Sequence, residues 1–133
     1  MRGVELVALE RHSDPRGSLL AFDGDAPLPF DVKNVYFILD CPAGAVRAEH
    51  ATAHHEALLA LSSAVTIDLD NGSERESVQL ATPETALIIA PGVWIRLREF
   101  TPETRLVVLS SSSYGETSHF AEPQPSLIDE TPP

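Results

Sequence analysis

Apolar residues lie along the chain in short runs that are separated by glycine, proline, asparagine and aspartate. Val35, Phe37 and Leu39 alternate with Tyr36 and Ile38, which is the two-residue period of a β-strand with two distinct faces. Similar runs predict strands at residues 6–9, 18–22, 32–39, 46–50, 54–62, 64–69, 77–80, 86–89, 93–99 and 105–111. The pattern therefore indicates a chain rich in β-structure.

Turn-forming residues connect the predicted strands. Asn71-Gly72 is the clearest hairpin turn, because both residues accept the positive φ values of a tight turn. Residues 12–17 are predicted to form a polar turn. Short strands at spacings of about 8–12 residues, without a long amphipathic helix, indicate an all-β sandwich or barrel. The domain is predicted to span residues 1–121, and the proline-rich segment 122–133 to be loose or to lie on the surface.

Composition narrows the class of protein. With 133 residues and 43% hydrophobic content, the chain is predicted to form one domain. No apolar run approaches the ~18 residues that a membrane span needs, and residues 1–7 do not resemble a signal peptide. Cys41 is the single cysteine, so an internal disulfide is excluded. We therefore expect a cytoplasmic protein that does not bind membranes.

The net charge of −11 argues against binding to nucleic acid, which needs a basic surface. A small anionic ligand stays possible, because a few arginines that converge in a pocket are enough to bind it. The chain has nine cationic residues, and all but one are arginine. Because cationic residues are so few, Arg16, Arg47, Arg96 and Arg98 are candidates for binding such a ligand.

A row of polar residues follows the predicted turn at 41–44. In an extended strand, His50, Thr52, His54 and Glu56 would project to the same side. Such a row is costly inside a core unless it lines a wet cavity. We therefore predict that this segment forms one wall of a ligand pocket.

The same row resembles the first motif of the cupin family. Gly44, His50 and Glu56 have its spacing, but Thr52 stands where the motif has a second histidine. The segment 91–95 resembles the second motif, with Ile95 at the place of its histidine. Two remaining ligands are fewer than the three that a catalytic metal site normally uses. The resemblance thus implies a cupin jelly-roll barrel (a double-stranded β-helix) without a metal ion or other cofactor.

A narrower resemblance covers residues 5–121. The chain is similar to the WxcM/FdtA-like cupins in Asp14-x-Arg16-Gly17-Ser18-Leu19, Asn34-Val35-Tyr36-Phe37-Ile38, Arg47-x2-His50-Ala51, Pro91-x2-Trp94 and Tyr114-x-Glu116-Thr117. Members include sugar 3,4-ketoisomerases that act on dTDP-4-keto-6-deoxyglucose. The resemblance implies a homodimer and metal-free proton transfer on a dTDP-linked keto sugar. The family has His-Ala-His where this chain has His50-Ala51-Thr52, and a histidine where it has Ile95.

A 3,4-ketoisomerisation needs a base to remove the proton next to the carbonyl and a donor for the neighbouring position. Histidine suits both roles, because its reference pKa of about 6.5 is near neutral pH. His50 is the candidate base, unless it only forms a hydrogen bond inside the core. Tyr36, expected on an adjacent strand, is the candidate to orient the substrate or donate a proton.

The missing histidine leaves the second role open. His54 could replace it, but two residues along a strand correspond to about 7 Å, so a solvated histidine at the strand end is the alternative. Thr52 and Glu56 share the face of His50 and are candidate substrate contacts. His12 and His119 lie in polar segments near the chain ends, and no role is assigned to them.

The arginines each have two interpretations. Arg47 could bind a diphosphate through its planar guanidinium, or form a surface ion pair with Glu49 on the face opposite His50. Arg16 matches its motif but could belong to a plain turn. Arg96 and Arg98 would lie on the same face of a strand. If this face is the barrel interior, the two arginines would bind an anion; if it is the exterior, they would contribute to solubility.

Two aromatic residues could stack on a thymine base, namely Trp94 and Tyr114, although either could instead belong to the core. The predicted function is metal-free isomerisation of a nucleotide-linked 4-keto-6-deoxysugar through an enediol. The alternatives are a dTDP-sugar epimerase and a nonenzymatic cupin that binds a nucleotide sugar. A metal-dependent cupin is the alternative that the motifs favour least.

Overall fold

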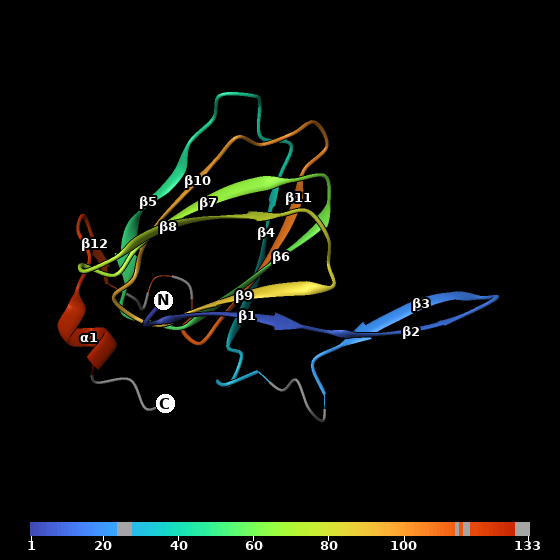
Figure 1. Ribbon diagram of the computed structural model, residues 1–133, viewed down its shortest axis with the longest axis horizontal. Coiled ribbons are helices and arrows are strands. Elements are labelled where there is room, and N and C mark those ends of the chain that lie inside the picture. The colour runs from blue at the N-terminus through green and yellow to red at the C-terminus, as the bar shows by residue number, and fades with distance from the viewer. Residues whose placement is uncertain (24–27, 114, 116–117, 130–133) are drawn as a thin grey trace.

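The computed structural model describes residues 1–23, 28–113, 115 and 118–129, which form an all-β barrel of two facing sheets (Figure 1). One five-stranded sheet has the order β1-β9-β6-β11-β4, and the other has the order β12-β5-β10-β7-β8. All strand pairs are antiparallel. The elements are β1 (Val4–Ala8), β2 (Glu10–Asp14), β3 (Gly17–Ala21), β4 (Asn34–Leu39), β5 (Arg47–Thr52), β6 (Glu56–Ser62), β7 (Val65–Asp70), β8 (Arg75–Leu80), β9 (Thr85–Ile89), β10 (Trp94–Arg98), β11 (Arg105–Ser110), β12 (His119–Phe120) and α1 (Pro125–Asp129). The all-β prediction is confirmed.

The main hydrophobic core lies between the two sheets. Strands β6 to β11 contribute alternate residues to it, as the two-residue period requires. Ile67 of β7, Leu87 of β9 and Leu106 of β11 are fully buried there. Strand β10 shows the alternation clearly, because Ile95 and Leu97 are buried and their neighbours are only partly so. Removing such a side chain from a packed core typically costs about 2–5 kcal/mol.

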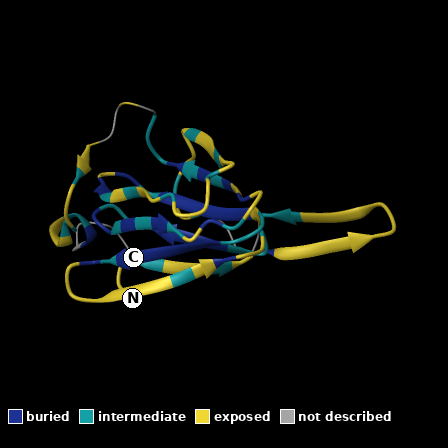
Figure 2. Ribbon diagram, turned by 90° about the horizontal axis from the view of Figure 1, so that it is seen from above, coloured by how far each residue is buried: buried dark blue, intermediate teal, exposed yellow. Residues whose placement is uncertain are grey.

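Strands β2 and β3 form a hairpin that extends away from the barrel (Figures 1 and 2). The prediction of a polar turn at 12–17 was therefore wrong for most of its length: only the tip between Asp14 and Gly17 is a turn. Every residue of β2 is exposed. The predicted strand at 18–22 corresponds to β3, but β2 is polar and exposed throughout, so the pattern could not reveal it.

A smaller hydrophobic cluster covers part of the outer face of the β1-β9-β6-β11-β4 sheet. Leu20, Phe22, Leu28 and Phe30 pack there against buried residues that include Leu59. This cover does not extend to the edge strand. On β4, the outward side chains of Val35, Phe37 and Leu39 are 47%, 60% and 52% exposed.

The segment after β12 packs against the turn between β9 and β10. Ile128 of α1 is buried in the main core cluster, and Gln124 N donates a hydrogen bond to Gly92 O at 2.8 Å. Gly92 has a φ of 92°, and a Cβ there would lie 2.3 Å from Gln124 O. Gly92 N in turn donates to Thr52 O at 2.8 Å. The described part of the segment that was expected to be loose or superficial thus contains a short helix with a buried anchor.

Among the described residues, no helix has the length and hydrophobicity to cross a membrane.

Candidate active site

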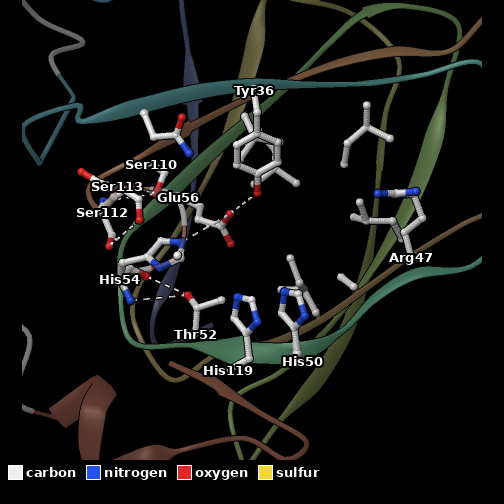
Figure 3. A pocket seen from close by; sticks show the side chains of 18 residues that line it. Tyr36, Arg47, His50, Thr52, His54, Glu56, Ser110, Ser112, Ser113 and His119 are labelled. Carbon is white, nitrogen blue, oxygen red and sulfur yellow. Dashed lines mark hydrogen bonds and ion pairs between the residues drawn. The ribbon is translucent and has the colours of Figure 1, made fainter. Parts of the chain in front are cut away.

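A cavity of about 600 Å³ opens between the sheets and is lined from β4, β5, β6, β10, β11 and β12. Its floor is apolar, with Leu58, Ile95 and Val108. Its polar residues include Tyr36, His50, Thr52, His54, Glu56 and His119 (Figure 3). A cavity of this size is in the range of small-molecule sites.

The four residues of the polar row all line this cavity, but they do not belong to one strand. Strand β5 ends at Thr52 and β6 begins at Glu56 in the opposite sheet. Thr52 Oγ1 donates to His54 O at 3.1 Å, and His54 N donates to Thr52 Oγ1 at 3.4 Å. These bonds fix the connection between the strands. The prediction of a strand from residue 54 was wrong for residues 54 and 55, and the row forms a corner of the cavity rather than one wall.

Glu56 is a buried carboxylate between two donors. Tyr36 Oη donates to Glu56 Oε2 at 2.7 Å, and His54 Nε2 lies 3.6 Å from the same oxygen. Burial acts to raise the pKa of Glu56, but the nearby His54 side chain and the hydrogen bond from Tyr36 outweigh it and hold the pKa below its usual value. Burial, and then the charge of Glu56, raise the pKa of Tyr36. Near neutral pH the site therefore contains an ionised Glu56 and a protonated Tyr36.

Tyr36 reaches the site from across the cavity. Its strand β4 pairs with β11 and lies in the sheet opposite β5, so the expectation of an adjacent strand was wrong. Figure 3 shows Tyr36 and Glu56 on one side of the cavity and His50 on the other. A substrate between them would meet the protonated Tyr36 hydroxyl group on one side and an imidazole on the other.

His50 lies beside a second histidine that the sequence analysis left without a role. The rings of His50 and His119 are stacked, with centroids 4.5 Å apart and planes inclined by 1°. Burial, followed by the like charge of His119, lowers the pKa of His50. His50 is therefore neutral near pH 7 and has the protonation state of a general base.

No local pattern marks His119 as a site residue. It belongs to a two-residue strand that pairs with β5, so that His119 lies opposite Thr52. Only this pairing between distant segments brings the imidazole into the cavity. The one available signal is that a chain with five histidines has few candidates for a second imidazole.

Arg47 lines the cavity together with His50, although a regular strand would place them on opposite faces. The cause is a β-bulge: His50 pairs with Ile95 and Ala48 with Arg96, so Glu49 has no partner of its own. Ala48 and Glu49 have φ values of 69° and 56°. The extra residue reverses the alternation, and the expectation that Arg47 shares a face with Glu49, away from His50, was wrong.

Trp94 and Arg96 lie on the outer face of the sheet. Arg96 Nε donates to Asp68 Oδ2 at 2.8 Å, and Arg98 Nε donates to the same oxygen at 2.6 Å. The Arg96 guanidinium lies 5.7 Å from the centre of the Trp94 ring. The exterior interpretation of these arginines is therefore the correct one, and they do not line the cavity between the sheets.

Arg16 is at the tip of the β2–β3 hairpin, and its side chain is 90% exposed. It donates to Asp14 through Nη2 at 2.6 Å and through its backbone N at 2.8 Å. It does not line the cavity of its own chain. Tyr114 lies outside the described residues.

The donor groups of the site do not match a metal centre. In the described parts of the chain, no three histidine, cysteine, aspartate or glutamate side chains are grouped to hold a metal ion. Ile95, at the place of the second-motif histidine, lies opposite His50 in the β10–β5 pair. The Thr52 hydroxyl is used by the backbone of His54.

The comparison with protein-family models gives a match over residues 2–125 to the FdtA family, described as WxcM-like, C-terminal. The chain belongs to the FdtA family. A curated relative, the TDP-4-oxo-6-deoxy-α-D-glucose-3,4-oxoisomerase of Aneurinibacillus thermoaerophilus, is 29% identical over 89% of this chain and 86% of its own.

Solved structures of related proteins share the fold. A histidine-to-asparagine mutant of the 3,4-ketoisomerase QdtA from Thermoanaerobacterium thermosaccharolyticum, in complex with TDP-4-keto-6-deoxyglucose, is 30% identical. The match covers 98% of this chain and 94% of QdtA with a TM-score of 0.84. The TDP-quinovose 3,4-ketoisomerase WlaRB from Campylobacter jejuni is 26% identical over 98% of this chain and all of its own, with a TM-score of 0.86. These matches agree with the predicted jelly-roll barrel and with the resemblance to the FdtA family.

Proposed function

We propose that this protein catalyses the 3,4-ketoisomerisation of a TDP-linked 4-keto-6-deoxysugar. The observation that carries the proposal is the neutral imidazole of His50 facing the Tyr36–Glu56 pair across a cavity large enough for a sugar. The chain belongs to a family whose members compared above are named as 3,4-ketoisomerases or an oxoisomerase of such sugars.

The reaction moves a carbonyl group from C4 to C3 without net oxidation. His50 removes the proton at C3, the electron pair of that bond forms the C3–C4 double bond, and the oxygen at C4 takes up a proton. The enediol then loses the proton of its C3 hydroxyl group and gains one at C4. Tyr36 is protonated and donates its hydrogen bond to Glu56, so its oxygen can accept a hydrogen bond from a sugar hydroxyl group and orient the ring for this transfer.

This chemistry proceeds without a metal ion in our proposal. Two positions that hold metal ligands in metal-binding cupins carry Thr52 and Ile95, whose side chains are poor ligands for a catalytic metal. Charge that develops on the sugar oxygens would instead be neutralised by proton transfer.

Arg47 is the proposed contact for the diphosphate, because it borders the cavity and its guanidinium can bind two oxygens at once. Thr52, His54 and Glu56 form the proposed sugar pocket. Trp94 and Arg96 are not included, since they lie on the outer face of the sheet. Tyr114 stays a prediction as a stacking residue.

We also propose that the protein acts as a homodimer in the cytoplasm. The exposed apolar residues Val35, Phe37 and Leu39 follow an edge strand, which favours coverage by another protein surface. In a dimer, the extended hairpin could bring Arg16 to the cavity of the partner subunit. Arg16 could then bind the substrate there, as its match to the family motif implies. Light scattering should give twice the monomer mass for the wild-type protein. Phe37→Glu should lower the measured mass towards that of the monomer. A monomeric wild-type protein would contradict this proposal.

Incubation with dTDP-4-keto-6-deoxyglucose in deuterated water tests the function. We expect NMR to show the 3-keto isomer, with solvent deuterium incorporated at C4. Inversion at a ring carbon without movement of the carbonyl group would instead identify an epimerase. Binding detected by calorimetry, with neither deuterium uptake nor product, would identify a nonenzymatic binding protein.

A further inference from the structure

The isomerisation requires two groups that exchange protons with the substrate, one at carbon and one at oxygen. His50 supplies the first. Thr52, where the related motif has a second histidine, cannot supply the second, because its hydroxyl has a pKa far outside the physiological range and is used by the His54 backbone. A second acid/base group must therefore come from elsewhere in the cavity.

His119 is in the right place. It lies directly opposite Thr52 in the antiparallel pair of β12 with β5, and residues opposite one another in such a pair project to the same face. Its imidazole thus enters the cavity beside Thr52 and stacks on His50. Figure 3 shows both rings directed into the same space, with Tyr36 and Glu56 across from them.

The stacking limits the pair to one proton at a time. Two imidazolium rings with centroids 4.5 Å apart would repel each other strongly, whereas one charged and one neutral ring would not. Burial lowers the pKa of His50, so His50 is the neutral member of the pair, whereas His119 is exposed to solvent. Arg47 also faces this space, whereas Glu56 is the carboxylate that can offset the charge. The pair therefore contains a base and an acid side by side.

We propose that His119 is a catalytic residue that exchanges protons with the sugar oxygens while His50 exchanges them with the carbons. This rests on the proposed ketoisomerase function. In the first half, His50 takes the C3 proton and the imidazolium of His119 protonates the C4 oxygen, which gives the enediol. In the second half, neutral His119 takes the proton of the C3 hydroxyl group, the carbonyl group forms at C3, and His50 returns a proton to C4. The pair holds one proton before, between and after these steps.

The test uses His119→Asn and His119→Ala in the full chain, with His55→Asn as the matched control. His55 stacks on Phe30 and is not a lining residue of the cavity. We expect kcat to fall about 10²–10⁴-fold in both His119 variants, as for loss of a general acid, with KM nearly unchanged. The alkaline limb of the kcat–pH profile, which requires a protonated His119, should disappear. His55→Asn should retain the wild-type kcat.

Chemical rescue separates a catalytic from a structural role. Because His119 is exposed, free imidazole should enter the gap left in His119→Ala. It should raise the kcat of this variant at least tenfold. Wild-type kcat in His119→Asn, or a loss that keeps the alkaline limb and does not respond to imidazole, would overturn this inference while the proposed function stands. A wild-type protein that converts no 4-keto sugar would instead refute the proposed function itself.

Discussion

The sheet β12-β5-β10-β7-β8 carries a polar cluster on each of its faces, and the two clusters differ in how their charges are matched. On the outer face, Asp68 meets Arg96 and Arg98 and also accepts a hydrogen bond from Ser77 Oγ at 2.6 Å. On the inner face, His50 and His119 stack with no carboxylate between them. Matched charges keep their protonation state over a wide pH range, whereas imidazole is the side-chain group whose ordinary pKa lies nearest to neutral pH. The outer cluster suits stability and the inner one suits proton transfer.

Removal of the inner base should have the largest effect. We expect His50→Asn to lower kcat about 10³-fold, equivalent to about 4 kcal/mol of transition-state stabilisation, because no other group at C3 can replace it. Product formation followed by NMR measures kcat, and thermal unfolding checks that the variant is folded. Wild-type turnover in a folded His50→Asn protein would show that the base is a different residue.

Loss of the outer carboxylate should affect stability and leave catalysis intact. Asp68→Asn is expected to reduce the free energy of unfolding by about 2 kcal/mol, since it weakens hydrogen bonds between charged partners. Urea unfolding measures this. Glu84→Gln, which disrupts the exposed pair with Arg11, is the control and should cost less than about 1 kcal/mol. A fall in kcat for Asp68→Asn would contradict the separation of the two clusters.

The same variant has a predictable dependence on pH. The hydrogen bond from Arg98, more than any other contact, holds the pKa of Asp68 below its usual value. The contribution of Asp68 is therefore complete above a pH of about 4, the reference value for the unfolded chain, and is lost as the pH falls further. The stability difference between wild type and Asp68→Asn should shrink under these acidic conditions.

The smallest expected effect is a shift in the pH profile of the inner cluster. Because burial and His119 lower the pKa of His50, the acid limb of kcat/KM should lie below pH 6.5, the reference value for histidine. In His119→Asn the like charge is gone, so the limb should move to higher pH. Titration of His50 by NMR measures the same change without turnover, and a shift in the opposite direction would disprove the coupling.

The sequence predicts the parts of the fold in which burial alternates along one strand. Strand β10 is such a case, with Ile95 and Leu97 inside the barrel. Strand β3 was predicted, but its partner β2 has no buried residue and was missed. The polar row was identified, but its geometry depends on the end of β5 at Thr52, which no local signal marks.

Two features of the site depend on contacts that a strand pattern cannot express. The bulge at Glu49 turns Arg47 towards the cavity, because one additional residue reverses the alternation. His119 reaches the cavity through a two-residue strand whose partner lies far away in the sequence. In both cases the sequence shows the residue, but not the face of the sheet on which its side chain lies.

Gly92 limits which substitutions and truncations this enzyme can tolerate. Its backbone N donates a hydrogen bond to Thr52 O at the rim of the cavity, and its backbone O accepts one from Gln124 N. A methyl group at this point would collide with the Gln124 carbonyl oxygen. Residues 122–129 therefore support the turn that is hydrogen-bonded to Thr52, and shortening the chain there would disturb the rim of the cavity in which the nucleotide sugar is proposed to bind.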